Sequence, residues 1–246
     1  MVEGDQDDPP SKLVTKLVKS SKLVNPPDQY VSPANAQEPG HVGQVGQGKG
    51  RGTSYTLVSH SDELNLAIST LQGAELLGLD IETSARLPHK GDVRLVQVSD
   101  GERTYVVDAW RVNPRPLLEL VYSKPWVAHN AAFEVSWISY HYDLEACVVR
   151  RPECTMMMSN ALRAGETEWK KKKDGTMYRT EVEHGLKDVA RRELGVEMSK
   201  EMQQSDWSAE ELSEEQMNYA ALDAAVLVPL RDRLRDRLRA ELEREA

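Results

Sequence analysis

Cysteine and long apolar runs are both scarce in this sequence of 246 residues. The only cysteines, Cys147 and Cys154, are too few for a disulfide framework or a dedicated zinc site. No apolar run approaches the ~20 residues that a membrane-spanning helix needs. The first residues also lack the basic and then apolar layout of a secretory signal. We therefore expect a protein of a reducing, cytoplasmic setting, without a membrane contact.

Positive charge is also in short supply. The sequence holds 40 Asp and Glu residues against 31 Lys and Arg residues, which gives a net charge of −9. This balance argues against broad electrostatic wrapping of nucleic acid. It leaves open an enzyme that reaches phosphate groups through metal ions. The length suffices for one large domain or two small ones with a real core.

Residues 1–53 have the composition of a disordered tail. They contain six of the 12 prolines and seven of the 15 glycines, so they cannot bury enough apolar surface to offset chain entropy. The triplet Lys-Leu-Val recurs at 12–14, 16–18 and 22–24. We interpret these basic repeats as a solvated tail, and a helix that docks a partner or nucleic acid is the alternative. The folded domain is predicted to span residues 54–246.

The order of strand-like and helix-like segments predicts the fold class. A strand at 55–59 and a helix between Ser61 and Gly73 precede three strands, and an Asp-Gly turn signal lies between the second and third of these. The three strands are expected at 76–83, 93–98 and 104–108. Shorter helices and strands then alternate at 117–121, 125–128, 131–141, 156–164 and 185–194. This order predicts an α/β fold with a mixed sheet, in which an antiparallel three-strand meander is joined by parallel strands and helices cover both faces.

A long helix is expected at the C-terminal end. Ser213 and Gln216 have the spacing of a capping box that opens a helix. Leucines at every fourth position from Leu230 to Leu242 then form an apolar stripe. Pro229 should kink this helix, because proline removes a backbone donor.

Two acids interrupt the apolar strand at 76–83. Asp80 and Glu82 occupy alternate positions, so their side chains project from the same face of the strand. Two buried carboxylates in that position would repel each other and lose hydration. A divalent cation removes this difficulty, because hard cations such as Mg²⁺ take oxygen ligands. The alternative is a strand end where acids meet solvent at a turn.

Two further segments carry groups suited to the same chemistry. Glu134 lies in the first turn of the helix that follows the short strand at 125–128, where ligand sites form in α/β sheets. Tyr219 and Asp223 are four residues apart on a predicted helix, so the hydroxyl and the carboxylate share one face.

These segments resemble the motifs of the DEDD 3′→5′ exonucleases. That group includes ribonuclease D, the Werner-type exonucleases and the proofreading domains of family A DNA polymerases. The likeness runs from about residue 54 to residue 230, and Tyr219 matches the tyrosine-bearing subgroup. Its motifs lie in order as Asp80 with Glu82, then His129 to Glu134, then Tyr219 with Asp223. Supporting likenesses lie at 94–97, 185–188 and 205–207.

The resemblance implies a ribonuclease H-like fold and a metal-dependent 3′→5′ exonuclease that releases nucleoside monophosphates from single-stranded DNA or RNA 3′ ends. Two divalent ions, Mg²⁺ or Mn²⁺, would lie roughly 3.5–4 Å apart at the scissile phosphate. Their ligands would be Asp80, Glu82 and Asp223, with Glu134 partly through water. Tyr219 would orient the attacking water, and Glu82 could touch the terminal 3′-hydroxyl. A separate polymerase or another replication or repair protein is the implied partner.

Two positions depart from the pattern of the family. The second motif usually ends in aspartate, and here it ends in Glu134, which keeps the charge but adds a methylene. We expect metal binding to survive, because the hard-ligand chemistry is unchanged. In Glu153-Cys154-Thr155, relatives often have an aspartate before the threonine.

Other residues are candidates for binding nucleic acid. Thr83 and Asn130 lie beside the proposed acids, although Asn130 is interpreted first as a helix cap. Lys170, Lys171, Lys172 and Lys173 precede an Asp-Gly turn signal and are flanked by Trp169 and Tyr178. They suit either a guide for single-stranded nucleic acid or a solvated hairpin tip. We interpret His129, Trp126, Trp137 and Trp207 mainly as packing residues.

Two alternatives to an exonuclease remain open. A catalytically weak module of the same fold would bind nucleic acid or act as a scaffold, its metal site weakened by Glu134. An endonuclease of the ribonuclease H-like group is the other alternative, and Tyr219 in the third motif argues against it.

Overall fold

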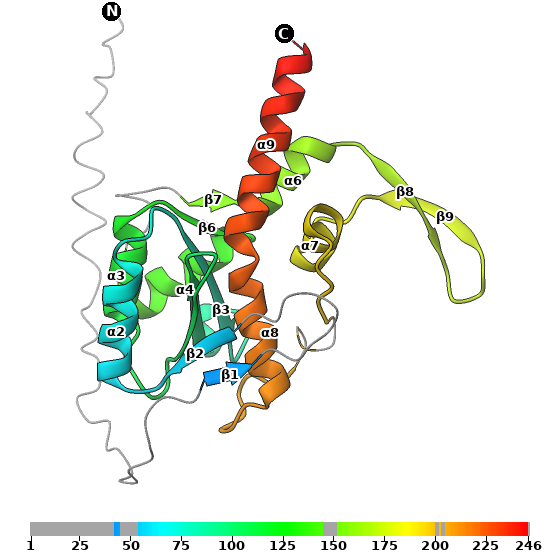
Figure 1. Cartoon of the computed structure of the whole chain (residues 1–246). Helices are drawn as coiled ribbons and strands as arrows, with labels where there is room; N and C mark the ends of the chain where they lie inside the picture. The colour runs from blue at the N-terminus through cyan, green and yellow to red at the C-terminus, as the bar shows by residue number, and fades with distance from the viewer. Residues whose placement is uncertain (1–41, 45–53, 145–151, 200–201, 203–204, 246) are drawn as a thin grey trace, which may run out of the picture. The chain divides into compact units, whose positions relative to one another are not determined.

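The computed structural model of the protein describes residues 42–44, 54–144, 152–199, 202 and 205–245 (Figure 1). The Lys-Leu-Val repeats and Cys147 lie outside the described residues. A short strand, β1 (Val42–Gln44), lies within the predicted tail and pairs with β2 (Ser54–Val58). The division of the chain between residues 53 and 54 stays a prediction.

Seven strands form one mixed sheet in the order β1-β2-β5-β4-β3-β6-β7. The antiparallel meander is confirmed, because β4 pairs antiparallel with both β3 and β5. Parallel pairs join β2 to β5, β6 to β3, and β7 to β6. The strands beyond β2 are β3 (Leu77–Thr83), β4 (Val93–Ser99), β5 (Thr104–Asp108), β6 (Trp126–Ala128) and β7 (Glu153–Cys154). The structure thus has the α/β mixed sheet that the sequence predicts.

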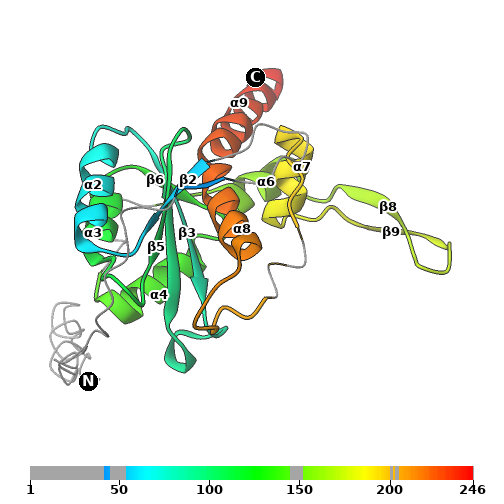
Figure 2. The same cartoon turned by 60° about the horizontal axis from the view of Figure 1, so that its bottom comes forward.

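Helices cover both faces of this sheet, as Figure 2 shows for α2 and α3 on one side and α8 on the other. The first face is covered by α2 (Ser61–Leu71), α3 (Arg115–Ser123) and α4 (Ala132–Tyr142). Their buried residues form one apolar cluster with Leu77, Leu79 and Ile81 of β3. The even-numbered residues of β3 therefore face the other layer, where α8 (Glu214–Ala225) packs on Leu95 and Val106.

The C-terminal end forms two helices rather than the single kinked helix that the sequence predicts. Helix α8 ends at Ala225, and α9 (Leu227–Glu245) begins two residues later. Pro229 has no backbone N–H to bond the carbonyl four residues earlier, which is that of Ala225, so the helical hydrogen bonding is interrupted there. Leu230 and Leu234 are fully buried in a cluster with residues of α6 (Thr155–Arg163) and α7 (Leu186–Leu194), whereas Leu242 is exposed.

The capping box at the start of α8 is confirmed. Ser213 Oγ accepts a hydrogen bond from the Gln216 backbone N–H at 3.2 Å, and Gln216 Oε1 accepts one from the Ser213 N–H at 2.9 Å. The amide nitrogen of Gln216 donates to Ser205 Oγ and to the Asp206 carbonyl, both at 3.1 Å. One side chain therefore joins the first turn of α8 to the segment that precedes it.

A two-stranded hairpin of β8 (Thr167–Lys171) and β9 (Met177–Glu181) forms a separate antiparallel sheet. It lies between α6 and α7 in the sequence and extends away from the main sheet in both views (Figures 1 and 2). A short 3₁₀ helix, η1 (Pro88–Lys90), lies in the loop after β3. Among the described helices, none is both long enough and apolar enough to cross a bilayer.

Candidate active site

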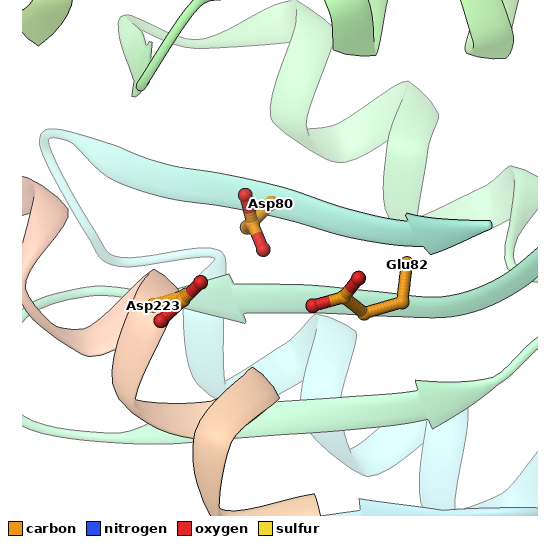
Figure 3. A group of neighbouring side chains, drawn as sticks. All are labelled: Asp80, Glu82 and Asp223. Carbon is orange, nitrogen blue, oxygen red and sulfur yellow. The ribbon is translucent and has the colours of Figure 1, made fainter. Parts of the chain in front are cut away.

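Three carboxylates from distant parts of the sequence meet between β3 and α8. Asp80 and Glu82 project from the same face of β3, and Asp223 lies on α8 opposite them (Figure 3). One carboxylate oxygen from each of the three residues lies within 4.8 Å of the others. The register of β3 explains the meeting, because its odd-numbered residues are buried against the opposite layer of helices.

The fourth predicted acid, Glu134, enters the same region from the first turn of α4. Its side chain is only 2% exposed, and its Oε2 atom is buried without a hydrogen-bond partner among the described residues. Glu134 does not belong to the group of three within 4.8 Å. Its charge nevertheless raises the pKa of Glu82, and that of Asp80 raises the pKa of Glu134, so the carboxylates interact.

Burial raises the pKa of every one of these acids. Loss of hydration raises the pKa of Asp80 to about 7. Burial and then the charge of Asp80 raise the pKa of Glu82, Glu134 and Asp223 well above their ordinary values. Such a cluster binds protons or cations, because unneutralised negative charges this close together and this poorly hydrated are costly.

Tyr219 lies one helical turn before Asp223 and hydrogen-bonds to its carboxylate. The bond lowers the pKa of Asp223, against the larger effect of burial. Burial and the charge of Asp223 raise the pKa of the Tyr219 phenol far above its ordinary value of 10.0. The phenol therefore keeps its proton and can donate a hydrogen bond, and it is not a base. Trp207 packs beside it, with ring centroids 6.4 Å apart.

The four acids and Tyr219 line an open cleft of about 680 Å³. Thr83 and Asn130, predicted to bind nucleic acid, also lie in its wall. The cleft is also lined by three residues that were not among the predicted site residues, namely Arg86, Phe133 and Asp206. Each lies within a few residues of a predicted site residue or supporting segment, which is the signal that could have found them. Among the described residues of the cleft wall, Arg86 is the one Lys or Arg.

The prediction that Asn130 caps α4 is wrong. The N-cap position belongs to Ala131, and no side chain makes a capping hydrogen bond there. Asn130 instead has a φ of 64°, a left-handed conformation that asparagine tolerates, and its carbonyl accepts from the Phe133 N–H at 2.8 Å. This sharp connection from β6 to α4 leaves the Asn130 side chain exposed at the cleft.

His129 packs at the end of β6 and also reaches the cleft. Its Nδ1 lies 2.9 Å from Thr155 Oγ1, and its Nε2 is buried without a partner among the described residues. Burial lowers the pKa of His129 to about 4, so the imidazole is neutral at pH 7. Cys154 is half-buried, and its charge contributes, after burial and Asp80, to raising the pKa of Glu134.

The four hairpin lysines lie outside this cleft. Lys170 pairs with Glu168 and Glu183 at N–O distances of 3.2 and 2.7 Å, and Lys171 to Lys173 are exposed near the tip. None of the four lines either of the two described pockets. A second hollow, of about 400 Å³, lies between the acidic cluster and the base of the hairpin. It is lined by Asp80 and Asp223 and also by Glu183, which follows β9.

The donor atoms of the site fit a hard divalent cation. They are carboxylate oxygens, and two of them, Glu134 Oε2 and Asp223 Oδ1, are buried without any hydrogen-bond partner in the described part of the chain. Mg²⁺ and Mn²⁺ take such oxygen ligands. A cation would also offset the mutual repulsion that raises the pKa values.

Comparison with known proteins assigns the chain to a family. Residues 55–239 match the family described as 3′-5′ exonuclease. The chain is 32% identical over 177 residues to DNA polymerase I of Aquifex aeolicus, which covers 70% of this chain but only 26% of the polymerase. The chain therefore spans about a quarter of the length of that relative.

Solved structures show the same fold. NrnC of Brucella melitensis is 26% identical, with a TM-score of 0.57 over 69% of this chain and 76% of that one. NrnC is also seen with bound Mg²⁺ and bound to pGG. RNase D of Escherichia coli has a TM-score of 0.61 at 19% identity, over 76% of this chain and 45% of that one, which supports the fold alone. Because the family model matches residues 55–239, three-quarters of the sequence, the chain belongs to the 3′-5′ exonuclease family.

Proposed function

We propose that this protein hydrolyses phosphodiester bonds from the 3′ end of single-stranded nucleic acid and releases nucleoside monophosphates. The observation that carries the proposal is the meeting of Asp80, Glu82 and Asp223 within 4.8 Å at the wall of an open cleft. Membership of the 3′-5′ exonuclease family supports the same reaction and direction.

We propose two divalent cations as cofactors. Asp80, Glu82 and Asp223 would hold them, and the buried carboxylate of Glu134 would complete the set, partly through water. The presence of Mg²⁺ in NrnC supports this choice of ion. When bound, the cations would neutralise charge on the scissile phosphate and favour ionisation of the attacking water.

The remaining side chains would orient the reactants. Tyr219 keeps its proton, so its hydroxyl would position the attacking water by hydrogen bonding rather than remove a proton from it. Glu82 would accept a hydrogen bond from the terminal 3′-hydroxyl. Thr83 and Asn130 would contact the last nucleotide. The Thr83 hydroxyl donates to the Ala85 carbonyl at 2.7 Å, so it would offer the substrate its lone pairs.

A 3′-labelled, single-stranded oligonucleotide tests this proposal. Purified protein with Mg²⁺ or Mn²⁺ should release labelled mononucleotide, EDTA should stop the release, and a circular strand of the same sequence should stay intact. Asp80→Ala should abolish the activity while its circular dichroism stays native. Binding without any shortening would support a non-catalytic module instead, and cutting of the circle would support an endonuclease.

Two finer assignments, the sugar of the substrate and the partner, can be tested separately. Parallel reactions on single-stranded DNA and RNA of one sequence would identify the sugar that the enzyme accepts. The likeness to part of DNA polymerase I supports a polymerase as the partner. Co-purification of the tagged full chain with the polymerases of its own cell would test that partnership.

A further inference from the structure

The β8–β9 hairpin carries a concentration of positive charge in an acidic protein. Five of its residues are cationic and three are anionic, whereas the chain as a whole has a net charge of −9. The cations are Lys170, Lys171, Lys172, Lys173 and Arg179, and the anions are Glu168, Asp174 and Glu181. The hairpin therefore offers a local surface that attracts polyanions.

The register of the hairpin separates its cations between two faces. Trp169 lies directly opposite Arg179, and Lys171 lies opposite Met177. Directly opposed residues share a face, and positions two apart along a strand share it as well. Trp169, Lys171, Met177 and Arg179 therefore form one face, which we call the outer face. Thr167 and Glu181 complete it at the base of the hairpin.

The opposite face is already occupied by internal contacts. Lys170 pairs there with Glu168 and Glu183. Lys172 near the tip lies over the ring of Tyr178, 5.5 Å from its centroid. Lys170 and Lys172 therefore have partners within the protein, so the four consecutive lysines do not form a single binding surface.

The outer face has few internal contacts. Trp169 is 67% exposed and Met177 is 52% exposed. Neither Lys171 nor Arg179 makes an ion pair with a described residue, although Arg179 donates a hydrogen bond to Thr167 Oγ1. An exposed indole with a cation along the strand and another across it is the arrangement that holds single-stranded nucleic acid, because a base stacks on the ring while the cations meet phosphates.

The hairpin begins at the edge of the hollow that contains the catalytic acids. Glu183, two residues after β9, lines this hollow together with Asp80 and Asp223. Arg179 is four residues before Glu183, so at ~3.3 Å per residue it lies at most about 13 Å from that edge, and Trp169 lies opposite it on the neighbouring strand. At ~3.4 Å per stacked nucleotide, this distance corresponds to about four nucleotides.

We infer that the outer face of the hairpin, through Trp169, Lys171 and Arg179, binds the single-stranded part of the substrate about four nucleotides upstream of the 3′ end that is being hydrolysed. The inference rests on the proposed function, because it adds a second contact to the same substrate. It assigns base stacking to Trp169 and phosphate contacts to Lys171 and Arg179. Short substrates end before this surface and gain nothing from it.

Substrate length and salt separate these roles. Affinity for a 5′-fluorescent 15-mer of single-stranded DNA or RNA, measured by anisotropy in EDTA, should fall roughly tenfold in Trp169→Ala, because stacking is lost. Its salt dependence should stay the same. Lys171→Ala and Arg179→Ala should each reduce the slope of log K against log salt by about 0.7, because one phosphate contact is removed.

Matched controls come from the same chain. Tyr140 is 61% exposed on α4, and Tyr140→Ala removes an exposed aromatic ring far from the hairpin in the sequence. Arg239→Ala removes an exposed cation from α9. Neither should change the affinity or the slope. Tyr178→Ala, on the opposite face of the hairpin, should have a smaller effect than Trp169→Ala.

Hydrolysis of a trinucleotide separates this inference from the proposed function. A trinucleotide is too short to reach the outer face, so Trp169→Ala and wild type should degrade it equally, whereas Asp80→Ala should not degrade it at all. If wild type degrades the trinucleotide but Trp169→Ala binds the 15-mer as tightly as wild type does, the inference is overturned and the proposed function stands. If wild type degrades neither substrate, the proposed function is wrong.

Discussion

Gly78 lies so close to Leu227 that a Cβ atom on the glycine would meet the Leu227 Cβ and the Ala224 carbonyl oxygen, each at 3.0 Å. Gly78 is two residues before Asp80 on β3, and Ala224 directly follows Asp223. The absence of a side chain at residue 78 therefore lets the end of α8 approach the strand at the level of the acidic cluster.

Replacing Gly78 should disturb the site although none of the acidic residues is changed. In Gly78→Ala the new methyl group must push α8 away from β3, at a cost of about 1–3 kcal/mol in unfolding free energy. A shift of about 1 Å in Asp223 should lower kcat about 10²-fold. Urea unfolding and hydrolysis of a single-stranded oligonucleotide measure the two effects. Gly73→Ala, which meets nothing within 4 Å, is the matched control. Wild-type activity in Gly78→Ala would show that the close approach is unnecessary.

Neutralising one acid should stabilise the cation-free protein. Asp223→Asn keeps the shape of the side chain but removes a buried charge that is repelled by Asp80, so the free energy of unfolding in EDTA at pH 7.5 should rise by roughly 1–2 kcal/mol. For a protein of this size the midpoint of thermal unfolding should rise by about 2–6 °C. The same variant should lose most of the stabilisation that Mg²⁺ gives the wild type. A lower melting temperature in EDTA would contradict the repulsion described here.

The stability of the cation-free protein should fall as the pH rises from about 4 to about 7. The pKa of Asp80 is 3.8 when unperturbed and about 7 in the fold. The folded state therefore holds a proton that the unfolded state has released, and the stability that this proton gives is present at low pH and is lost as the pH rises through the folded pKa. The effect is on the order of a few kcal/mol. The difference in unfolding free energy between wild type and Asp80→Asn, measured in EDTA across this range, isolates it. A difference that does not change with pH would contradict the raised pKa.

Tyr219→Phe should separate orientation from metal binding. The variant loses the hydroxyl that we assign to positioning the attacking water, so kcat should fall roughly 10- to 100-fold. The four acids remain, so Mg²⁺ should still raise the melting temperature. The pKa of Asp223 should rise further, because the lost hydrogen bond had lowered it. Unchanged kcat would exclude Tyr219 from the reaction.

Shortening the side chain of residue 134 tests whether the site needs the longer reach of glutamate. The start of α4 is fixed by the fully buried Trp137 and Ile138, so Glu134→Asp should withdraw the carboxylate by about one carbon–carbon bond, ~1.5 Å. We expect the rate to fall about 10²-fold. Glu134→Gln keeps the length and removes the charge, so it shows whether charge or reach matters more. Full activity in Glu134→Asp would mean that the extra methylene is not used.

Much of the fold and most of the acids follow from local sequence. The alternation of Asp80 and Glu82 within an apolar strand fixes their common face, and the spacing of Tyr219 and Asp223 fixes theirs. The position of the helix break is less predictable: Pro229 signals a disturbance, but the break lies at Val226, because the missing bond is to the carbonyl four residues earlier.

Features that depend on tertiary neighbours do not follow from local sequence. The left-handed φ of Asn130 arises from the sharp connection between β6 and α4, which no residue pattern near it indicates. The pairing of Lys170 with Glu183 requires the fold of the hairpin base. Arg86 becomes a cleft residue only because the loop after β3 turns back toward the acids.

Gln216 joins two parts of the candidate site. Its backbone N–H and its side-chain oxygen cap the start of α8 through Ser213. Its side-chain nitrogen donates hydrogen bonds to Ser205 and Asp206, which line the cleft. A substrate that pressed this wall outward would have to unwind the first turn of the helix that supplies Asp223. The same amide thus couples one wall of the cleft to the start of α8, so a displacement of that wall would be transmitted to the helix that carries Asp223.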